Sequence, residues 1–291
     1  MDFIIDAITD WIKGFLIDAI TGNLSNMFGD VNTKVATIAG EVGKTPEEWN
    51  SGVFSMIHSL SESVIVPIAG LVIAAILSYE LIHMVIDKNN MHDFDTFIFF
   101  KWIIKAGIAV YVVNHTFDFI IAIFEVAQTI VQQSAGVIDA NASIDISSAL
   151  ASITTELEAK ELGELFALML ETWVVSFAMT VMGALITIIL YGRMIEIYIY
   201  ASVGPLPFAT FTNHEWGNIG TNYVRGLVAL GLQGFLILIL ICVAIYAVLI
   251  QNVAISGDAI NSIWSIVGYT VLLCFSLFKS AGVAKSILNA H

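Results

Sequence analysis

Residues 64–86 read "VIVPIAGLVIAAILSYELIHMVI", and this stretch decides the fold class. It holds one carboxylate, Glu80, one proline, Pro67, and no Lys or Arg. A helix of about 20 mostly apolar residues is long enough to cross the hydrocarbon core of a bilayer. Residues 64–86 therefore predict a transmembrane helix that bends at Pro67.

The composition extends this prediction to the whole chain. Hydrophobic residues make up 58% of the 291 residues, charged residues make up 12%, and the mean hydropathy is +0.87. No segment alternates polar and apolar residues as the strands of a membrane barrel do. Four further apolar runs are long enough to span, at residues 96–113, 172–191, 226–250 and 260–278. The expected fold class is all-α, a polytopic helical membrane protein with about five transmembrane helices plus amphipathic helices.

The basic residues predict the topology. With the N-terminus outside, the inner segments hold seven Lys and Arg residues, and the longer outer segments hold four. The positive-inside rule then predicts a multi-pass protein of the cell membrane, with its N-terminus outside and its C-terminus inside. The expected regions are an extracytoplasmic region at 1–63, spans one and two at 64–113, an acidic extracytoplasmic helical region at 114–171, and spans three to five at 172–291.

The N-terminal region predicts an amphipathic helix. Charged residues recur at helical spacing among Ile, Trp and Phe, at Asp2, Asp6, Asp10, Lys13 and Asp18. Helices that lie on anionic lipid usually carry a basic polar face. The acidic face of this helix favours packing against protein over binding to lipid. Residues 21–63 are interpreted as a turn-rich connection with short helical pieces.

A polar stripe follows the second span. Its members recur at helical spacing among apolar residues, at Asn114, Asp118, Glu125, Gln128 and Gln132. The stripe either marks a helix half-sunk at the outer surface or lines a wet cavity. One helix over residues 96–133 would be roughly 57 Å long, so the chain either hinges near Asn114–His115 or projects outward. Further on, Thr155 and Glu158 predict a capping box that starts the helix into span three.

Three charged residues fall at membrane depth, Glu80 in span one and Lys101 and Lys105 in span two. Charges inside a bilayer are costly and usually face protein or water. Glu80 is expected either to pair with one of the two lysines or to meet the headgroups while both lysines snorkel to the inner surface.

No motif predicts catalysis. His214 and Glu215 begin like a zinc-protease helix, but the second histidine is missing. No G-x-S-x-G nucleophile elbow occurs. The sequence therefore predicts no enzyme, no catalytic or metal site and no cofactor.

Residues 193–220, "RMIEIYIYASVGPLPFATFTNHEWGNIG", predict a cytosolic hairpin within the segment 192–225. A helix over residues 156–203 would measure roughly 72 Å, longer than the bilayer is thick. Gly204 is expected to turn sharply through positive φ, the prolines that follow it stop the helix, and Asn213 caps the returning one. The hairpin stands off the inner surface or dips back into it. Its candidate turn and partner contacts are Gly204, Pro205, Pro207, Phe208, Phe211 and Trp216.

The stretch "YGRMIEIYIYASVGPLPFATF", followed by a Trp and another apolar span, resembles the TrbL family of polytopic type IV secretion and conjugation subunits. The resemblance covers residues 60–285 in organisation and about 190–225 in motif. It implies a membrane platform or scaffold at a translocation channel, within a protein complex for conjugal transfer. It also implies partners, namely a cytosolic ATPase inside and other apparatus subunits outside, and no catalytic residues. The apolar hairpin separately predicts a partner on the cytosolic side, either further copies of the chain in a homo-oligomer or another protein of the complex.

Nucleic acid is expected to be at most a transient partner, because the acidic outer segments would repel phosphate. The alternatives are a small-solute transporter or ion channel and a structural membrane protein of another assembly. A transporter would favour repeated halves with charges at mid-membrane, and the sequence shows no internal repeat. Nine lysines against two arginines are typical of an AT-rich genome and would fit a Gram-positive conjugative element.

Overall fold

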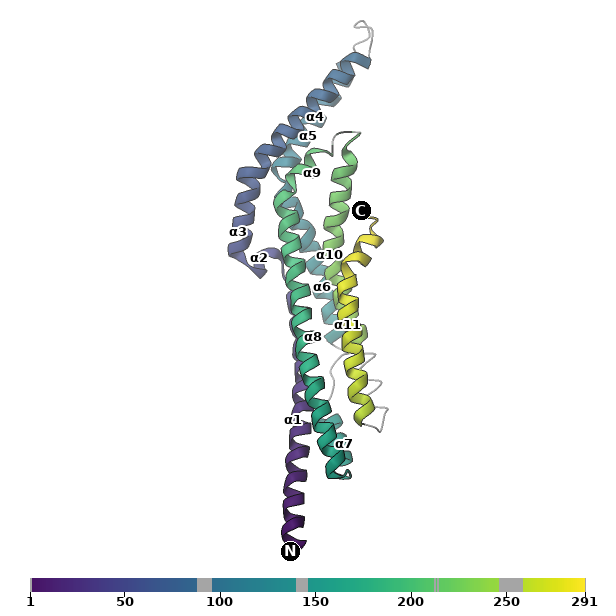
Figure 1. The fold of residues 1–291 in the computed structure, drawn as a ribbon. Helices are drawn as coiled ribbons and strands as arrows, with labels where there is room; N and C mark the ends of the chain where they lie inside the picture. The colour runs from purple at the N-terminus through teal and green to yellow at the C-terminus, as the bar shows by residue number, and fades with distance from the viewer. Residues whose placement is uncertain are drawn as a thin grey trace. The chain divides into compact units, whose positions relative to one another are not determined.

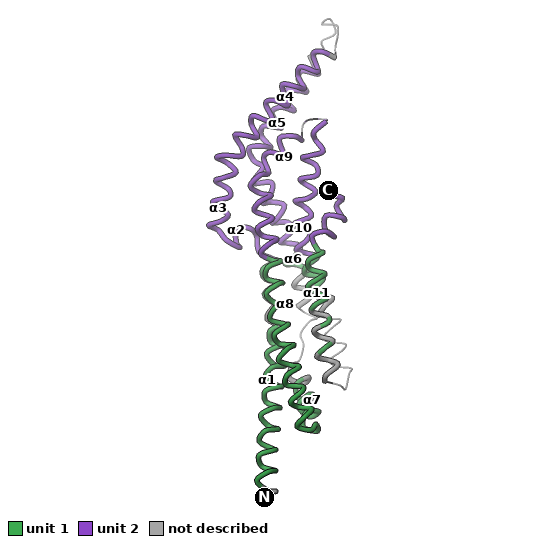
Figure 2. Tube along the Cα trace, in the orientation of Figure 1, with its two compact units in different colours: residues 1–42, 131–190, 236–280 green, residues 43–130, 191–235, 281–291 purple. Residues whose placement is uncertain are grey.

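The structure is a computed structural model, and it describes residues 2–87, 96–139, 146–211, 213, 215–245 and 259–290. The regular elements of these residues are helices, drawn in Figure 1. The chain divides into two compact units, which Figure 2 colours green and purple. Unit 1 comprises residues 1–42, 131–190 and 236–280, and unit 2 comprises residues 43–130, 191–235 and 281–291.

Four described helices are long and apolar enough to cross a membrane, which confirms the polytopic helical class. They cover Ser51–Ile86, Phe97–Asn114, Leu162–Val203 and Gly217–Leu240. The fifth predicted span lies in the helix α11 (Ala259–Ile287), which is not among these four and stays a prediction. The end of the fourth predicted span, residues 246–250, lies outside the described residues.

Unit 1 is built on the N-terminal helix α1 (Asp2–Val42), which packs against α7 (Ile146–Glu158). The helix is continuous through residues 21–42, so the turn-rich interpretation of that segment is wrong. Its buried residues explain the difference, because they recur at helical spacing and bury one face, at Leu16, Ile20, Leu24, Met27, Ile38 and Val42. The glycines in this segment lower the stability of the helix by less than the packing of that face raises it.

The predicted capping box at Thr155 is also wrong. Thr155 lies inside α7, where its hydroxyl donates to the carbonyl of Ala151, and α7 ends at Glu158. A new helix, α8 (Leu162–Val203), then begins. Ile153 and Leu157 are buried and carry α7 past Thr155, so packing outweighs the local capping signal.

Unit 2 contains the helices around the predicted hairpin. They are α2 (Pro46–Trp49), α3 (Ser51–Leu60), α4 (Val66–Asp87), α5 (Thr96–Asn114), the first part of α6 (Thr116–Asp139), the end of α8, α9 (Pro205–Ala209), the first part of α10 (Gly217–Ile245) and the end of α11. The core of this unit joins α4, α5, α6, α8, α9 and α10.

The helix that carries the first predicted span begins at Ser51 and runs across the expected boundary at 63–64. A π-helical turn, η1 (Ser61–Ile65), stands between α3 and α4. At its end the amide of Val66 donates to the carbonyl of Ser61, five residues back. Pro67 has no amide hydrogen for the helical ladder, and a π-turn is one way in which a helix accommodates such a residue.

The helix of the second predicted span covers Phe97–Asn114. Of the two alternatives for residues 96–133, the structure shows a helix break at the place given for the hinge. α5 ends at Asn114, His115 is a turn residue, and α6 begins at Thr116. The buried hydroxyl of Thr116 donates to the carbonyls of Val112 and Val113, at 2.9 and 3.0 Å. The Thr116 side chain thus satisfies backbone carbonyls where the helix breaks.

Candidate functional site

The candidate site is the chain reversal between α8 and α10 in unit 2. α8 ends at Val203, Gly204 leads into the one-turn helix α9, and the chain returns through Thr210 and Asn213 to α10. Gly204 is right-handed, with φ −47° and ψ −43°. The expectation that it uses positive φ is therefore wrong, and no described glycine does so.

Gly204 is needed instead for a close approach. A Cβ atom at this position would overlap the Cδ1 methyl of Ile120 in α6. It would also stand 3.0 Å from the Tyr223 hydroxyl and 3.1 Å from the Thr116 Cγ2 methyl. Because Gly204 has no side chain, the chain reversal can pack directly against α6.

The predicted partner contacts divide into buried and exposed residues. α9 packs against α4 and α5, and Phe208 is only 8% exposed within the core cluster. Pro205 is buried as well. Phe208 and Pro205 are therefore not contact surfaces, because the chain's own spans already cover this turn. Phe211 and Trp216 remain 39% and 48% exposed.

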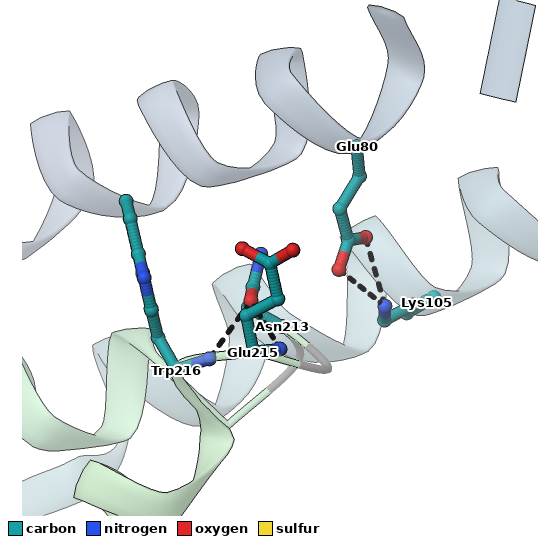
Figure 3. Close-up of polar contacts among 5 residues, drawn as sticks. All are labelled: Glu80, Lys105, Asn213, Glu215 and Trp216. Atoms are coloured by element: carbon teal, nitrogen blue, oxygen red, sulfur yellow. Dashed lines mark hydrogen bonds and ion pairs between the residues drawn. The ribbon is translucent and has the colours of Figure 1, made fainter. Parts of the chain in front are cut away.

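Side chains satisfy the polar backbone of the reversal. Asn213 Oδ1 accepts from the amides of Glu215 and Trp216 at 2.7 and 2.9 Å, as predicted for a cap of the returning helix (Figure 3). The Thr210 hydroxyl donates to the Pro207 carbonyl at 2.7 Å and accepts from the Gly220 amide at 3.1 Å. Side chains thus satisfy these polar backbone groups of the turn.

An ion pair lies next to this turn. Lys105 Nζ stands 2.8 Å from both carboxylate oxygens of Glu80, whose side chain is 18% exposed (Figure 3). Lys101 instead lies over the Phe97 ring, with its Nζ 4.7 Å from the ring centroid. Of the two possible partners for Glu80, the structure therefore selects Lys105. The pairing joins α4 to α5 beside the turn.

Aromatic rings connect α4 to the start of α10. The Tyr79 ring lies nearly parallel to the Trp216 ring, with centroids 6.3 Å apart and an interplanar angle of 10°. The His83 ring also packs edge-on against the Tyr79 ring, at 4.3 Å between centroids. The cluster thus joins α4 to the residues just before α10 through ring contacts.

The members of the predicted polar stripe lie in different surroundings. Asp118 and Glu125 line a hollow of about 510 Å³ that Glu47 and His58 also line. Gln128 instead donates to the Glu48 carboxylate at 2.7 Å. The two ends of the stripe, Asn114 and Gln132, are exposed and do not line the hollow. That the hollow holds water in the assembled protein stays a prediction.

Sequence reasoning missed a buried charge and two tyrosine contacts. Arg193 is buried, and its Nε and one terminal nitrogen donate to the Leu230 carbonyl at 3.3 Å. The Tyr198 hydroxyl donates to the Pro46 carbonyl at 2.7 Å, and the Tyr223 hydroxyl donates to the Tyr200 carbonyl. These contacts join segments far apart in sequence, so no local pattern signals them. Among the described residues, no three His, Cys, Asp or Glu side chains gather as a metal site.

Comparison with known families gives a match over part of the chain. The family described as "TrbL/VirB6 plasmid conjugal transfer like protein" matches residues 31–205, more than half of the chain. The matched region begins before the resemblance noted at residue 60 and stops within the Gly-Pro turn. No curated protein and no solved structure matches the chain.

Proposed function

Because the chain belongs to the TrbL/VirB6 family of plasmid conjugal transfer proteins, we propose that it is a membrane platform subunit that shapes the translocation path of a conjugation apparatus. The family makes it a component of a conjugal transfer or type IV secretion system, and its apolar helices make it a multi-pass membrane protein. The scaffold role is the proposed part.

The observation that carries the scaffold role is the buried α8–α9–α10 reversal. Phe208 and Ala209 pack among Ala69, Ile73 and Ala109 of the first two spans. Close packing of this kind resists local opening, since an opened turn would lose its apolar contacts and expose backbone groups. A fixed junction between spans suits a platform on which other subunits assemble.

The transporter alternative has one observation in its favour, a helix interrupted beside two charges. Transporters often bind ions or substrates at such interruptions. Here Glu80 and Lys105 neutralise each other at 2.8 Å, and Asn213 Oδ1 already accepts two backbone amides. The polar groups of this interruption thus bind each other, which favours the scaffold.

The proposed partners follow from the apparatus. Inside the cell the platform would contact a cytosolic ATPase, and in the membrane it would meet other apparatus subunits and further copies of itself. Nucleic acid would touch it only in passing, since the chain carries a formal net charge of −14 and would repel phosphate.

The test is removal and replacement in a transfer-proficient donor. We expect loss of the chain to abolish conjugal transfer and to leave the remaining membrane subunits unable to co-purify as one complex. Re-expression of the chain should restore both. If transfer is lost while the other subunits still assemble normally, the chain acts as a transport component rather than as a platform, and the scaffold role is wrong.

A further inference from the structure

The depth of the α8–α9–α10 reversal follows from the two spans that it contacts. α9 packs against both α4 and α5. Its side chains share one core cluster with residues of these two helices, at Ala69, Ile73, Ala109, Phe208 and Ala209. Both helices belong to segments that are long and apolar enough to cross a membrane, and their three cluster residues lie away from the ends of those segments. α9 is therefore level with the interior of two candidate membrane spans.

We propose that α9 is embedded in the membrane, at the depth of the hydrocarbon core, and does not stand off the cytosolic surface. Ile73 lies near the middle of the apolar run at residues 64–86. At 1.5 Å per residue, a neighbour of Ile73 lies more than about 10 Å from either end of that run. The proposal goes beyond the proposed function and does not depend on it, because it concerns the depth of the turn and not its role in an apparatus.

The backbone of the reversal is bonded as a membrane-embedded turn requires. Lipid offers no hydrogen bonds, so irregular backbone occurs at membrane depth where protein buries it and supplies the partners. Here the Thr210 amide donates to the Pro207 carbonyl at 3.1 Å, and the Gly217 amide donates to the Asn213 carbonyl at 2.9 Å. The Thr210 hydroxyl also accepts from the Gly220 amide. Thr210 and Asn213 are themselves buried. A turn in water could leave such groups to the solvent.

The apolar side chains that the reversal leaves exposed suit hydrocarbon. Ile199 and Val203 lie four residues apart on one face of α8 just before the turn, and Phe211 follows α9. All three are exposed. In water these side chains would lose the free energy that burial provides, whereas lipid tails are as apolar as the side chains themselves. The contacts with α4 and α5 set the depth of the turn, and this surface agrees with it.

The polar end of the reversal limits how far it reaches. The Trp216 ring lies against Tyr79 of α4, and the ion pair of Glu80 and Lys105 comes next along that helix (Figure 3). Glu215 is exposed at the same end. Charges within hydrocarbon are costly, so this end lies nearer the membrane surface than α9 does. A partner on that side would then meet Glu215 and Trp216 and would not reach α9.

Quenching of a fluorophore attached to single cysteines tests the depth of the turn. The full chain, with Cys242 and Cys274 replaced, is placed in lipid nanodiscs, so that both membrane faces meet water. The fluorophore is attached at Val203→Cys or Phe211→Cys, two positions that are exposed beside α9. Nitroxide-bearing lipid quenches a fluorophore in hydrocarbon, and iodide quenches one in water.

Two control positions calibrate the quenching. Ile108→Cys is the matched membrane control, because Ile108 is 59% exposed in α5 and precedes Ala109 of the shared cluster. Glu161→Cys, exposed between α7 and α8, is the water control. Lipid quenching at Val203→Cys and Phe211→Cys should equal that at Ile108→Cys and exceed that at Glu161→Cys several-fold. Iodide quenching at both turn positions as strong as at Glu161→Cys would overturn the proposal.

A charge placed beside α9 gives an independent test in cells. Val203→Asp should lower the amount of membrane-inserted chain several-fold, as Ile108→Asp should, because a carboxylate in hydrocarbon is costly. Val203→Leu is the apolar control and should leave the amount unchanged. A normal amount of the Val203→Asp chain, with Ile108→Asp depleted, would place the turn in water and contradict the proposal. Neither test uses conjugal transfer as its readout, so failure here leaves the scaffold role untouched.

Discussion

At the residue scale, Gly204 acts by lacking a side chain, and this leads to a first prediction. Gly204→Ala should lower the stability of the solubilised protein by about 1–3 kcal/mol, the usual cost of overpacking a core. Ile120→Val in the same chain should recover part of the loss, because it removes the overlapping methyl. Gly70→Ala in α4 is the matched control, since a Cβ atom there would have nothing within 4 Å. Thermal unfolding measures all three, and an unchanged Gly204→Ala midpoint would contradict the close approach.

A second residue-scale prediction concerns the ion pair. Lys105→Met should leave Glu80 without its partner and destabilise unit 2, by about 1–3 kcal/mol after allowance for the partial exposure of Lys105. Lys101→Met should cost less, since Lys101 contacts the Phe97 ring and not Glu80. The double variant Glu80→Gln with Lys105→Met should recover stability. A thermal double-mutant cycle with no coupling between Glu80 and Lys105 would show that the pair contributes nothing.

At the element scale, the structure separates the two phenylalanines of the reversal. Phe208→Ala should empty part of the core and cost about 3–5 kcal/mol, as for other buried aromatic residues. Phe211→Ala should fold normally, because Phe211 is partly exposed, and should weaken assembly if the turn contacts a partner. Unfolding midpoints and co-purification of apparatus subunits distinguish the two effects. Equal loss of stability in both variants would argue against this division.

The polar face of α6 is the second element with a testable role. If the hollow beside Asp118 and Glu125 holds water, replacing both residues with Leu should impair conjugal transfer at normal protein level, since the apolar groups would displace that water. Gln132→Leu lies outside the hollow and serves as the control. Transfer frequency and immunoblotting give the readout. Normal transfer by the double variant would favour a helix that merely lies half-sunk at the outer surface.

At the scale of the whole molecule, the distribution of Lys and Arg predicts the orientation in the membrane. In a chain with Cys242 and Cys274 replaced, single cysteines at Ser51 and Ser143 should react with an impermeant reagent in intact cells. A cysteine at Ser286 should react only after the cells are opened. Labelling of Ser286 in intact cells, or protection of Ser143, would reject an N-terminus outside and a C-terminus inside.

The sequence by itself determined the helical membrane class, because a backbone in lipid must satisfy its own hydrogen bonds and long apolar runs do so as helices. It also offered a hinge at Asn114–His115 as one of two alternatives, and the structure shows the break there. It predicted the cap at Asn213, whose side chain accepts from the amides two and three residues on. Its Gly-Pro stretch resembled the TrbL family, to which the chain belongs. These features depend on local chemistry.

Only the tertiary structure decided which surfaces pack. The length of α1 depends on the packing of its buried face within unit 1, because tertiary packing supplies most of a helix's stability. The glycines of this segment favour turns when the sequence is considered alone, so the sequence did not predict the full helix. Glycine occurs both in turns and where two backbone segments pack closely. Only the position of Ile120 shows that Gly204 is needed because α6 packs closely against it. An apolar residue such as Phe208 suits a partner surface or a core equally well, and the packing of α9 against α4 and α5 places it in the core.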